Sequence, residues 1–356
     1  MANGRSAPEA EDGDMLARAA WLHFVGGMTH AEVGAQLRVP GFKIQRLIAR
    51  ATRSGVVQVF INSPVADCVR LERTLCRIYR LVTCLVAPRL GDVPASKALA
   101  AAGAQSLFRI LQTGSHRTIG LGHERTLSAN VAYLPHCHAP DTSFVALHGG
   151  LTTSFSADPY DVIHSITGRT GAHGYFLSVP FFANSAADRA VLLAQIGVMQ
   201  VQALARTASL FLVGVGTATR DGFLVQNGSI GEEDLARLAR LGAKGEILAY
   251  FHDRDRRRIE TGISDRTVTL SYDELAGCNI VAAGGGADKI DALQAILRSG
   301  LLKGLITDEA TAATLVARAD GAAIAVCRSC VPVKAANRVA RPASLQPPRA
   351  RRAGAR

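Results

Sequence analysis

The stretch Thr29–Arg53, THAEVGAQLRVPGFKIQRLIARATR, predicts two short helices separated by a tight turn. Thr29 and Glu32 stand three residues apart, which is the spacing of a capping box, so the first helix begins here and runs to about Leu37. Residues 38–41 include a proline followed by a glycine and end that helix. The apolar residues of the next helix recur at helical spacing and form one continuous face: Ile44, Leu47, Ile48 and Ala51.

A third helical pattern, Asp14 to Phe24, precedes this pair and ends at the Gly26-Gly27 break. The last helix also carries cations at its other positions, namely Lys43, Arg46, Arg50 and Arg53. Three short helices, a tight turn and a final helix that is apolar on one side and basic on the other predict a helix-turn-helix that binds DNA. The simpler alternative is a cationic helix face that is merely solvated.

Particular residues of this last helix suit particular parts of DNA. Gln45 and Arg46 can pair with base edges, whereas Lys43 and Arg50 suit phosphates. The predicted DNA-binding residues are Gly41, Phe42, Lys43, Gln45, Arg46 and Arg50.

The composition is that of a globular protein with room for more than one core, since 48% of the 356 residues are hydrophobic and 19% are charged. The longest apolar runs, such as 210–215, fall far short of the roughly 20 residues that span a bilayer. The acidic N-terminus lacks the pattern of a secretory signal, which predicts a cytoplasmic protein. Seven cysteines, an odd number scattered along the chain, argue against a disulfide framework.

The formal net charge of +11 is concentrated in the helix-turn-helix and at the C-terminus, and the central body is close to neutral. Residues 334–356 include seven basic and no acidic residues. The last sixteen residues, 341–356, are rich in proline, alanine and arginine and cannot bury a core, so we expect them to be disordered. Such a tail either holds nucleic acid nonspecifically or has no specific role.

From about residue 68 onward, strands alternate with helices. Strands separated by about 10 to 15 helical residues predict parallel pairing through right-handed crossovers, which gives an α/β fold with a doubly wound sheet. The helical patterns are 68–79, 191–205 and 289–299. The expected strands are 81–86, 118–121, 143–147, 176–179, 210–215, 247–251, 279–283 and 304–307.

Glycine-rich loops follow four of these strands and are the expected ligand site, because ligands of such sheets lie beyond the carboxyl ends of the strands. The loops are 119–126, 147–152, 213–217 and 282–289. None completes a Walker A sequence, and none has G-x-G-x-x-G in a first strand-to-helix turn, so nucleotide-binding classes rank low. The absence of G-x-S-x-G and H-E-x-x-H removes two common hydrolase classes.

Two further groups of residues have the chemistry of a site. His123 and Glu124 can form a general acid and base pair, or they can line a polyol pocket without doing chemistry, and we favour binding. The segments 136–138 (HCH) and 327–330 (CRSC) lack a second pair of ligands at a zinc-finger spacing. We therefore expect no metal site and no cofactor.

Several segments, in order along the chain, resemble the SorC family of bacterial sugar-responsive transcriptional regulators. They are 120–127 (GLGHERTL), 214–217 (GVGT), 232–235 (EEDL), 242–247 (GAKGEI), 282–289 (AAGGGADK) and 305–312 (LITDEATA). The resemblance covers about residues 14 to 325. Within the family, 20–29 (AWLHFVGGMT) and 180–184 (PFFAN) look most like the regulators of erythritol catabolism.

The resemblance implies a cytoplasmic repressor, commonly tetrameric, in which a winged-helix-like helix-turn-helix module precedes a sugar-isomerase-like effector domain. It implies no catalysis. The effector of relatives is usually a phosphorylated sugar held by the glycine loops. The corresponding positions here are Gly122, Glu124, Arg125, Thr126, Gly149, Gly150, Gly216, Thr217, Glu246 and Lys289. The sequence departs from the family at Pro40, where many relatives have a serine cap, and at His123-Glu124, where small or aromatic residues are common.

The predicted divisions are a disordered N-terminus at 1–13, a DNA-binding domain at 14–60, a sugar-binding and oligomerisation domain at 61–333, and a basic disordered tail at 334–356. The predicted function is regulation of a sugar or polyol catabolic operon, in which a carbohydrate or sugar phosphate, erythritol or a derivative among them, controls binding to double-stranded operator DNA. Two alternatives stay open: a sugar-phosphate isomerase or deaminase with an added DNA-binding module, and a nucleoid protein that acts through its tail. No membrane partner is expected.

Overall fold

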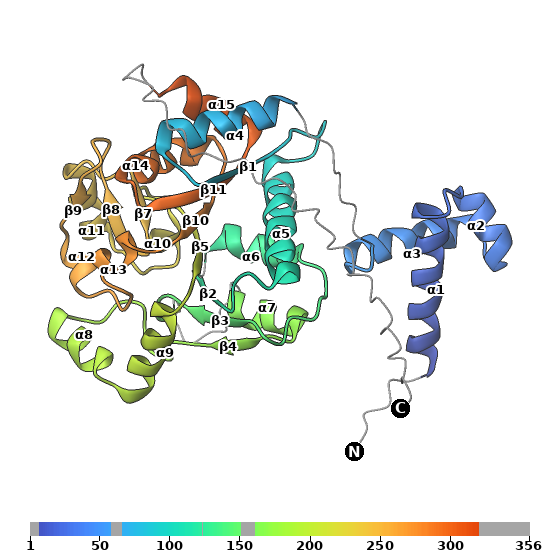
Figure 1. The fold of residues 1–356 in the computed structure, drawn as a ribbon, viewed down its shortest axis with the longest axis horizontal. Helices are drawn as coiled ribbons and strands as arrows, with labels where there is room; N and C mark the ends of the chain where they lie inside the picture. The colour runs from blue at the N-terminus through green and yellow to red at the C-terminus, as the bar shows by residue number, and fades with distance from the viewer. Residues whose placement is uncertain (1–6, 58–65, 123, 151–160, 320–356) are drawn as a thin grey trace, which may run out of the picture.

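The computed structural model describes residues 7–57, 66–122, 124–150 and 161–319 (Figure 1). Its first three helices are α1 (Ala7–Phe24), α2 (His30–Leu37) and α3 (Gly41–Arg53). Residues 7–13, which we expected to be disordered, form the first turns of α1.

The three helices share a small core of their own, and it confirms the predicted apolar face of α3. Ile44 and Ala51 are fully buried against Val33 of α2 and Leu16 of α1. The capping box of α2 is present: the Thr29 amide donates to Glu32 Oε2 at 2.7 Å, and the Glu32 amide donates to Thr29 Oγ1 at 3.3 Å. The described residues up to Val57 contain no strand, so no wing is seen there.

The body contains a seven-stranded, wholly parallel sheet, which confirms the predicted doubly wound architecture. In spatial order its strands are β1 (Thr83–Ala87), β11 (Leu302–Asp308), β10 (Ile280–Ala283), β5 (Leu210–Gly214), β2 (Thr118–Leu121), β3 (Ser143–Ala146) and β4 (His173–Tyr175). The predicted strand at 176–179 is therefore wrong, because the edge strand lies at 173–175. All three of its residues are exposed, so no apolar pattern marks it.

Helices cover both faces of this sheet (Figure 1). One face packs against α4 (Ala66–Tyr79), α9 (Ile196–Arg206), α14 (Ile290–Ser299) and α15 (Glu309–Ala317), and the other against α5 (Ala95–Thr113), α6 (Arg125–Ala132) and α7 (Val162–Thr170). Side chains of successive residues in a strand point to opposite faces of the sheet, so they pack into different cores. In β5, Phe211 and Val213 join the first core, whereas Leu210 and Leu212 join the second.

A smaller antiparallel sheet lies beside the first and consists of β6 (Gly216–Thr217), β7 (Gly245–Ile247), β8 (Tyr250–His252) and β9 (Arg258–Ile259). The predicted continuous strand at 247–251 is wrong, because Leu248 and Ala249 form a hairpin turn with φ of 50° and 62°. These angles belong to a type I′ turn, which usually contains asparagine and glycine. Both residues are buried, so the unbroken apolar run gave no sign of the turn.

The remaining elements are α8 (Ala186–Leu193), α10 (Phe223–Gln226), α11 (Glu232–Arg240), α12 (Gly262–Asp265), α13 (Tyr272–Ala276) and the 3₁₀ turn η1 (Ala287–Lys289). The single helix predicted at 191–205 is two helices, α8 and α9. The backbone of Gln195 is extended, with ψ of 134°, and no proline or glycine marks the break.

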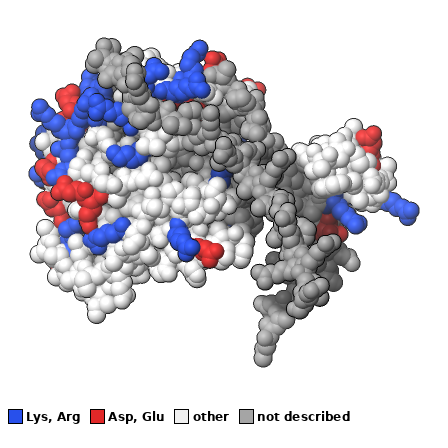
Figure 2. Space-filling view, viewed as in Figure 1, with Lys and Arg blue, Asp and Glu red and all other residues white. Residues whose placement is uncertain are grey.

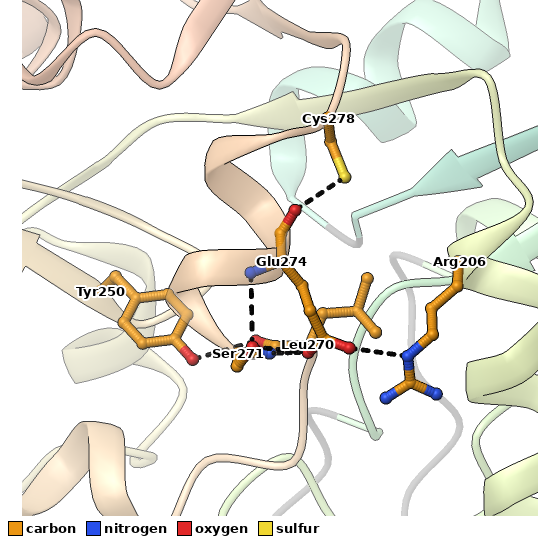
Figure 3. Close-up of polar contacts among 6 residues, drawn as sticks. All are labelled: Arg206, Tyr250, Leu270, Ser271, Glu274 and Cys278. Carbon is orange, nitrogen blue, oxygen red and sulfur yellow. Dashed lines mark hydrogen bonds and ion pairs between the residues drawn. The ribbon is translucent and has the colours of Figure 1, made fainter.

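Polar contacts at α13 fasten the small sheet to the body (Figure 3). The Tyr250 hydroxyl of β8 donates to the Leu270 carbonyl at 2.9 Å. In α13, the Glu274 carboxylate accepts from the Ser271 amide at 2.7 Å and from Arg206 Nε of α9 at 2.6 Å. The hairpin that carries β7 and β8 is therefore held against the helices of the large sheet.

Candidate functional site

The strand order reverses direction between β2 and β5, and this switch point is where ligands of doubly wound sheets bind. From β2 the chain proceeds to β3 and β4 on one side, and then returns to β5 on the other side. The loop after β2 leads through Gly122 into α6, and β5 is followed after Val215 by β6, which begins at Gly216. Two of the four predicted glycine loops thus lie next to each other.

Glu124 places a carboxylate at this switch point. It is the residue that precedes α6, and its side chain lies over two glycines. A Cβ on Gly122 would lie 2.5 Å from Glu124 Oε2, and a Cβ on Gly214 would lie 2.8 Å from Glu124 Cβ. Burial raises the pKa of this carboxyl, while hydrogen bonds from the backbone at Gly214 and at Glu124 itself oppose the increase. Oε2 is buried and has no hydrogen-bond partner in the described part of the chain.

Glu246 of β7 supplies a second carboxylate, of which only 7% is exposed. A Cβ on Gly216, its partner in the β6–β7 pair, would lie 1.9 Å from Glu246 Oε1, so only glycine leaves room for it. Oε2 accepts a hydrogen bond of 2.9 Å from the Ala249 amide, which belongs to the left-handed hairpin turn. Burial is the main reason that the pKa of Glu246 is raised to about 7; the charge of Glu124 adds to the increase, while the hydrogen bond from Ala249 and the charge of Lys289 oppose it.

Lys289, at the end of η1, is a cation whose charge acts on both carboxylates. Burial lowers the pKa of its ammonium group, and the nearby charges of Glu124, Asp288 and Glu246 oppose that change, while Arg125 adds to it. Arg125 itself lies over the Phe223 ring, with Cζ 5.6 Å from the ring centroid. We call Glu124, Arg125, Glu246 and Lys289 the charged cluster.

Asp308 holds the loop that leads to Lys289, and sequence reasoning gave this residue no role. The Gly286 amide donates to Asp308 Oδ2 at 3.1 Å and to Thr311 Oγ1 at 2.9 Å. Asp308 also caps α15 by accepting from the Thr311 amide at 2.9 Å. A Cβ on Gly285 would lie 2.1 Å from Asp308 Oδ2, so this turn also needs glycine. The available signal was an aspartate at a strand end with a threonine three residues later, the spacing of a helix cap.

The other predicted effector residues have more ordinary surroundings. The amides of Gly149 and Gly150 donate to the carbonyls of Val268 and Val179, so these two glycines are part of the backbone hydrogen bonding that joins neighbouring segments. Thr217 Oγ1 lies 3.0 Å from Thr219 Oγ1, and Thr126 is partly buried in the first turn of α6. His123 lies outside the described residues.

The predicted DNA-binding residues lie on one exposed side of α3. All six of them are exposed: Gly41, Phe42, Lys43, Gln45, Arg46 and Arg50. Phe42 is 70% exposed. Large aromatic side chains are more often buried. The Pro40 backbone caps the helix start without a side-chain hydrogen bond, so the helix forms despite the missing serine.

The surface of the body shows compensated charge. At the margin that carries β9 and α11, basic and acidic atoms alternate (Figure 2). Arg220 pairs with Glu232 at 2.7 Å, Arg266 pairs with Asp234 at 2.8 Å, and Arg258 pairs with Glu260. These three ion pairs compensate charge along this margin.

Two absences hold for the described part of the chain. It contains no cluster of three or more His, Cys, Asp or Glu side chains that can hold a metal ion. It also contains no helix long and apolar enough to cross a membrane. Cys327, Cys330 and the basic tail lie outside the described residues.

Comparison with known proteins identifies the family of this chain. Residues 63–317 match the family described as "Putative sugar-binding domain". The erythritol catabolism regulatory protein EryD of Brucella abortus (strain 2308) is 44% identical over 312 residues, which cover 87% of this chain and 98% of that protein. The chain belongs to the SorC family of sugar-binding transcriptional regulators.

Two further similar proteins agree with this assignment. The transcriptional regulator LsrR of Enterobacter sp. (strain 638) is 31% identical over 86% of this chain and 94% of its own length. The full-length sorbitol operon regulator SorC of Klebsiella pneumoniae superposes with a TM-score of 0.67 at 22% identity, over 88% of this chain and 100% of that one. These proteins are regulators, and the SorC-family fold therefore combines the helix-turn-helix with the sugar-binding body in one chain.

Proposed function

We propose that this SorC-family protein represses a polyol catabolic operon, binds operator DNA through α3, and is controlled by an effector bound at the charged cluster. The observation that carries the proposal is that one chain joins an exposed recognition helix to a switch point lined by charged side chains. The 44% identity to a regulator of erythritol catabolism supports a small polyol or its phosphate as effector. We assign DNA binding to 14–60, effector binding and assembly to 61–333, and nonspecific contacts to the tail at 334–356.

We further propose that the protein is a cytoplasmic tetramer without enzymatic activity. Assembly through the body sets the spacing of the helix-turn-helix units, and effector binding changes that spacing. A coupling of about 1 to 3 kcal/mol between the two sites changes DNA affinity by roughly 5-fold to 150-fold, which is enough to control transcription.

Titration of labelled DNA from the region upstream of the protein's own operon tests this function. The measurement is made at fixed salt, with and without erythritol and its phosphorylated catabolites, because DNA affinity depends steeply on salt. Sequence-specific binding that one compound shifts is the expected result. Binding that is indifferent to sequence and to every compound would instead indicate a nonspecific DNA-binding protein.

Lys289→Ala is expected to weaken effector binding at least tenfold and to leave DNA binding in the absence of effector unchanged. The reason is that the variant leaves Glu124 and Glu246 without the cation whose charge acts on both. Isothermal titration calorimetry measures the first effect, and the DNA titration measures the second. Lys97→Ala, on the exposed surface of α5, is the charge-matched control. Loss of both activities in the Lys289 variant would point to misfolding of the body.

A sugar-phosphate isomerase or deaminase is the second candidate, and one observation favours it. Glu246 has a pKa raised to about 7, mainly by burial, so it is suited to exchange protons near neutral pH. Turnover of a sugar phosphate by the purified protein, abolished in Glu246→Gln, would support this activity.

A further inference from the structure

Exposed arginines lie along the outer face of α4, the first helix of the body. Their spacing of three, four and three residues places them on one side of the helix. They are Arg70, Arg73, Arg77 and Arg80, the last of which directly follows the helix. The opposite side of α4 is buried in the core of the body through Cys68, Leu75 and Tyr79. The helix is therefore held by its apolar side and presents arginines to solvent.

The acidic residues of α4 compensate only one of these arginines. Asp67 Oδ1 lies 3.1 Å from Arg70 Nη2 and pairs with it. Glu72 lies on the side of the helix that faces β1, where its Oε1 accepts from the Val86 amide at 2.9 Å. The other three arginines make no ion pair with another described residue. Three positive charges on this helix face are thus left uncompensated.

A further cation adjoins the end of α4. The positive charge of Arg298 in α14 acts on the Tyr79 hydroxyl, and Arg298 Nη1 donates to the Arg254 carbonyl rather than to a carboxylate. In Figure 2, basic atoms gather at the upper margin of the body, which is the margin that α4 occupies in Figure 1. We call Arg73, Arg77, Arg80 and Arg298 the basic surface.

The acidic residues of the neighbouring elements do not cancel this charge. Asp291 of α14 pairs with Arg318 at 2.5 Å. Glu309, at the start of α15, accepts from the Arg89 amide at 2.8 Å. The turn at 253–257, which includes Arg254, contains two acidic and three basic residues and so adds no negative charge. The basic surface therefore suits an anionic partner.

A nucleic-acid backbone fits the basic surface better than a second copy of the chain. In a two-fold interface the same surface meets itself, so arginine would face arginine. The rise of an α-helix places Arg73 and Arg80 about 10 Å apart along the axis. Duplex DNA of this length presents about three phosphates on the strand that faces the protein. This number matches the three uncompensated arginines of α4.

The covalent link between α3 and α4 keeps the basic surface close to the DNA that α3 contacts. Residues 54–65 join Arg53, at the end of α3, to Ala66, at the start of α4. A chain of this length spans at most about 45 Å when fully extended. One turn of duplex DNA is about 34 Å long. Duplex within one or two turns of the sequence read by α3 is therefore within reach of the body.

We propose that the basic surface is a second DNA-contact surface, which binds backbone phosphates of the duplex that flanks the sequence read by α3. This inference rests on the DNA binding of the proposed function and adds a contact outside the helix-turn-helix. Phosphate contacts carry no base information, so the surface contributes affinity without sequence preference. Arg77 and Arg80 lead into the amino end of β1, whereas the charged cluster lies beyond the carboxyl ends of β2 and β5 in the same parallel sheet. The two sites are therefore at opposite edges of the sheet.

Titration of the full-length protein with its upstream duplex and with a scrambled duplex, at several salt concentrations, tests the inference. The variant combines Arg73→Gln, Arg77→Gln and Arg80→Gln. The slope of log affinity against log salt concentration is expected to become less steep by about 2 to 3, since each phosphate contact contributes about 0.9. Affinity at about 0.1 M salt is expected to fall at least tenfold on both duplexes. The preference for the upstream duplex stays unchanged.

A charge-matched control combines Arg109→Gln of α5 with Arg237→Gln and Arg240→Gln of α11. These three arginines are also exposed, and they lie on other parts of the body. Their replacement is expected to change the slope by less than about 1, because one phosphate contact alone is worth that much. Equal slopes for the two triple variants would show that only net charge matters and would overturn the inference.

Two other outcomes also contradict the second DNA contact. One is an unchanged slope together with a changed oligomeric state in analytical ultracentrifugation, which would assign the basic surface to another copy of the chain. The other is a loss of affinity confined to the upstream duplex, which would indicate base reading. If the melting temperature shows that the triple variant fails to fold, Arg77→Gln alone decides, with an expected slope change of about 0.9.

The same titration separates this inference from the proposed function. Wild-type protein that binds the upstream and the scrambled duplex alike would remove the proposed regulatory function. The slopes of wild-type and variant protein on the scrambled duplex would still confirm or refute the phosphate contacts of the basic surface.

Discussion

Glu246→Gln is expected to stabilise the ligand-free protein by about 3 kcal/mol at pH 8 and to leave its stability unchanged at pH 4. Burial raises the pKa of this carboxyl to about 7 from an ordinary value of 4.5. Between these two values the folded state holds a proton that the unfolded state has released. The free energy of unfolding therefore falls as pH rises through this window, and above about pH 7 the full cost of a buried charge is present.

Glutamine removes this cost because it is neutral at every pH, and its side-chain oxygen can still accept from the Ala249 amide. The measurement is thermal or urea unfolding of both proteins from pH 4 to pH 8, followed through the transition of the body. Glu233→Gln, on the exposed side of α11, is the matched control and should change stability by less than about 0.5 kcal/mol at any pH. A difference between wild type and Glu246→Gln that does not grow with pH contradicts the buried ionisation.

Arg46→Glu is expected to lower operator affinity at least a hundredfold and to leave the fold and effector binding intact. A guanidinium that pairs with a base contributes about 1 to 3 kcal/mol, and the introduced carboxylate adds repulsion from the phosphates. Arg46 is exposed between the buried Ile44 and Leu47, so its replacement leaves the core of the module unchanged.

Fluorescence anisotropy with the upstream DNA at several salt concentrations measures this loss. Arg18→Glu makes the same change in net charge on the exposed side of α1 and separates a local contact from general electrostatics. Equal weakening by the two variants would show that α3 has no special role in reading DNA.

Local patterns predicted the parts of the fold that depend on local physics. The capping box at Thr29 and the apolar face of α3 follow from spacing alone, and both are present. The buried strands at 118–121 and 279–283 also stand out, because central parallel strands are apolar on both faces and are bounded by glycine.

The errors arose where tertiary contacts override local pattern. The apolar run at 247–251 has the same appearance in a straight strand and in a hairpin, and the hairpin is held by Glu246 and by the Tyr250 hydroxyl. The exposed strand at 173–175 is fixed by pairing with β3, a contact that its own sequence does not reveal. Local pattern likewise gave no sign that Glu124 and Glu246 lie together, since only the return of the chain from β4 to β5 brings them to one place.

The pairing of β1 with β11 has a consequence for the synthesis of this protein. Thr83 lies opposite Gly304, so the first strand of the body is completed by the last one. On the ribosome the three-helix module, with its own core, can fold as soon as it emerges, whereas the large sheet must wait for nearly the whole chain. A nascent or truncated chain that ends before residue 302 therefore contains a folded three-helix module and an incomplete large sheet. The response to effector is then the last property that the protein acquires.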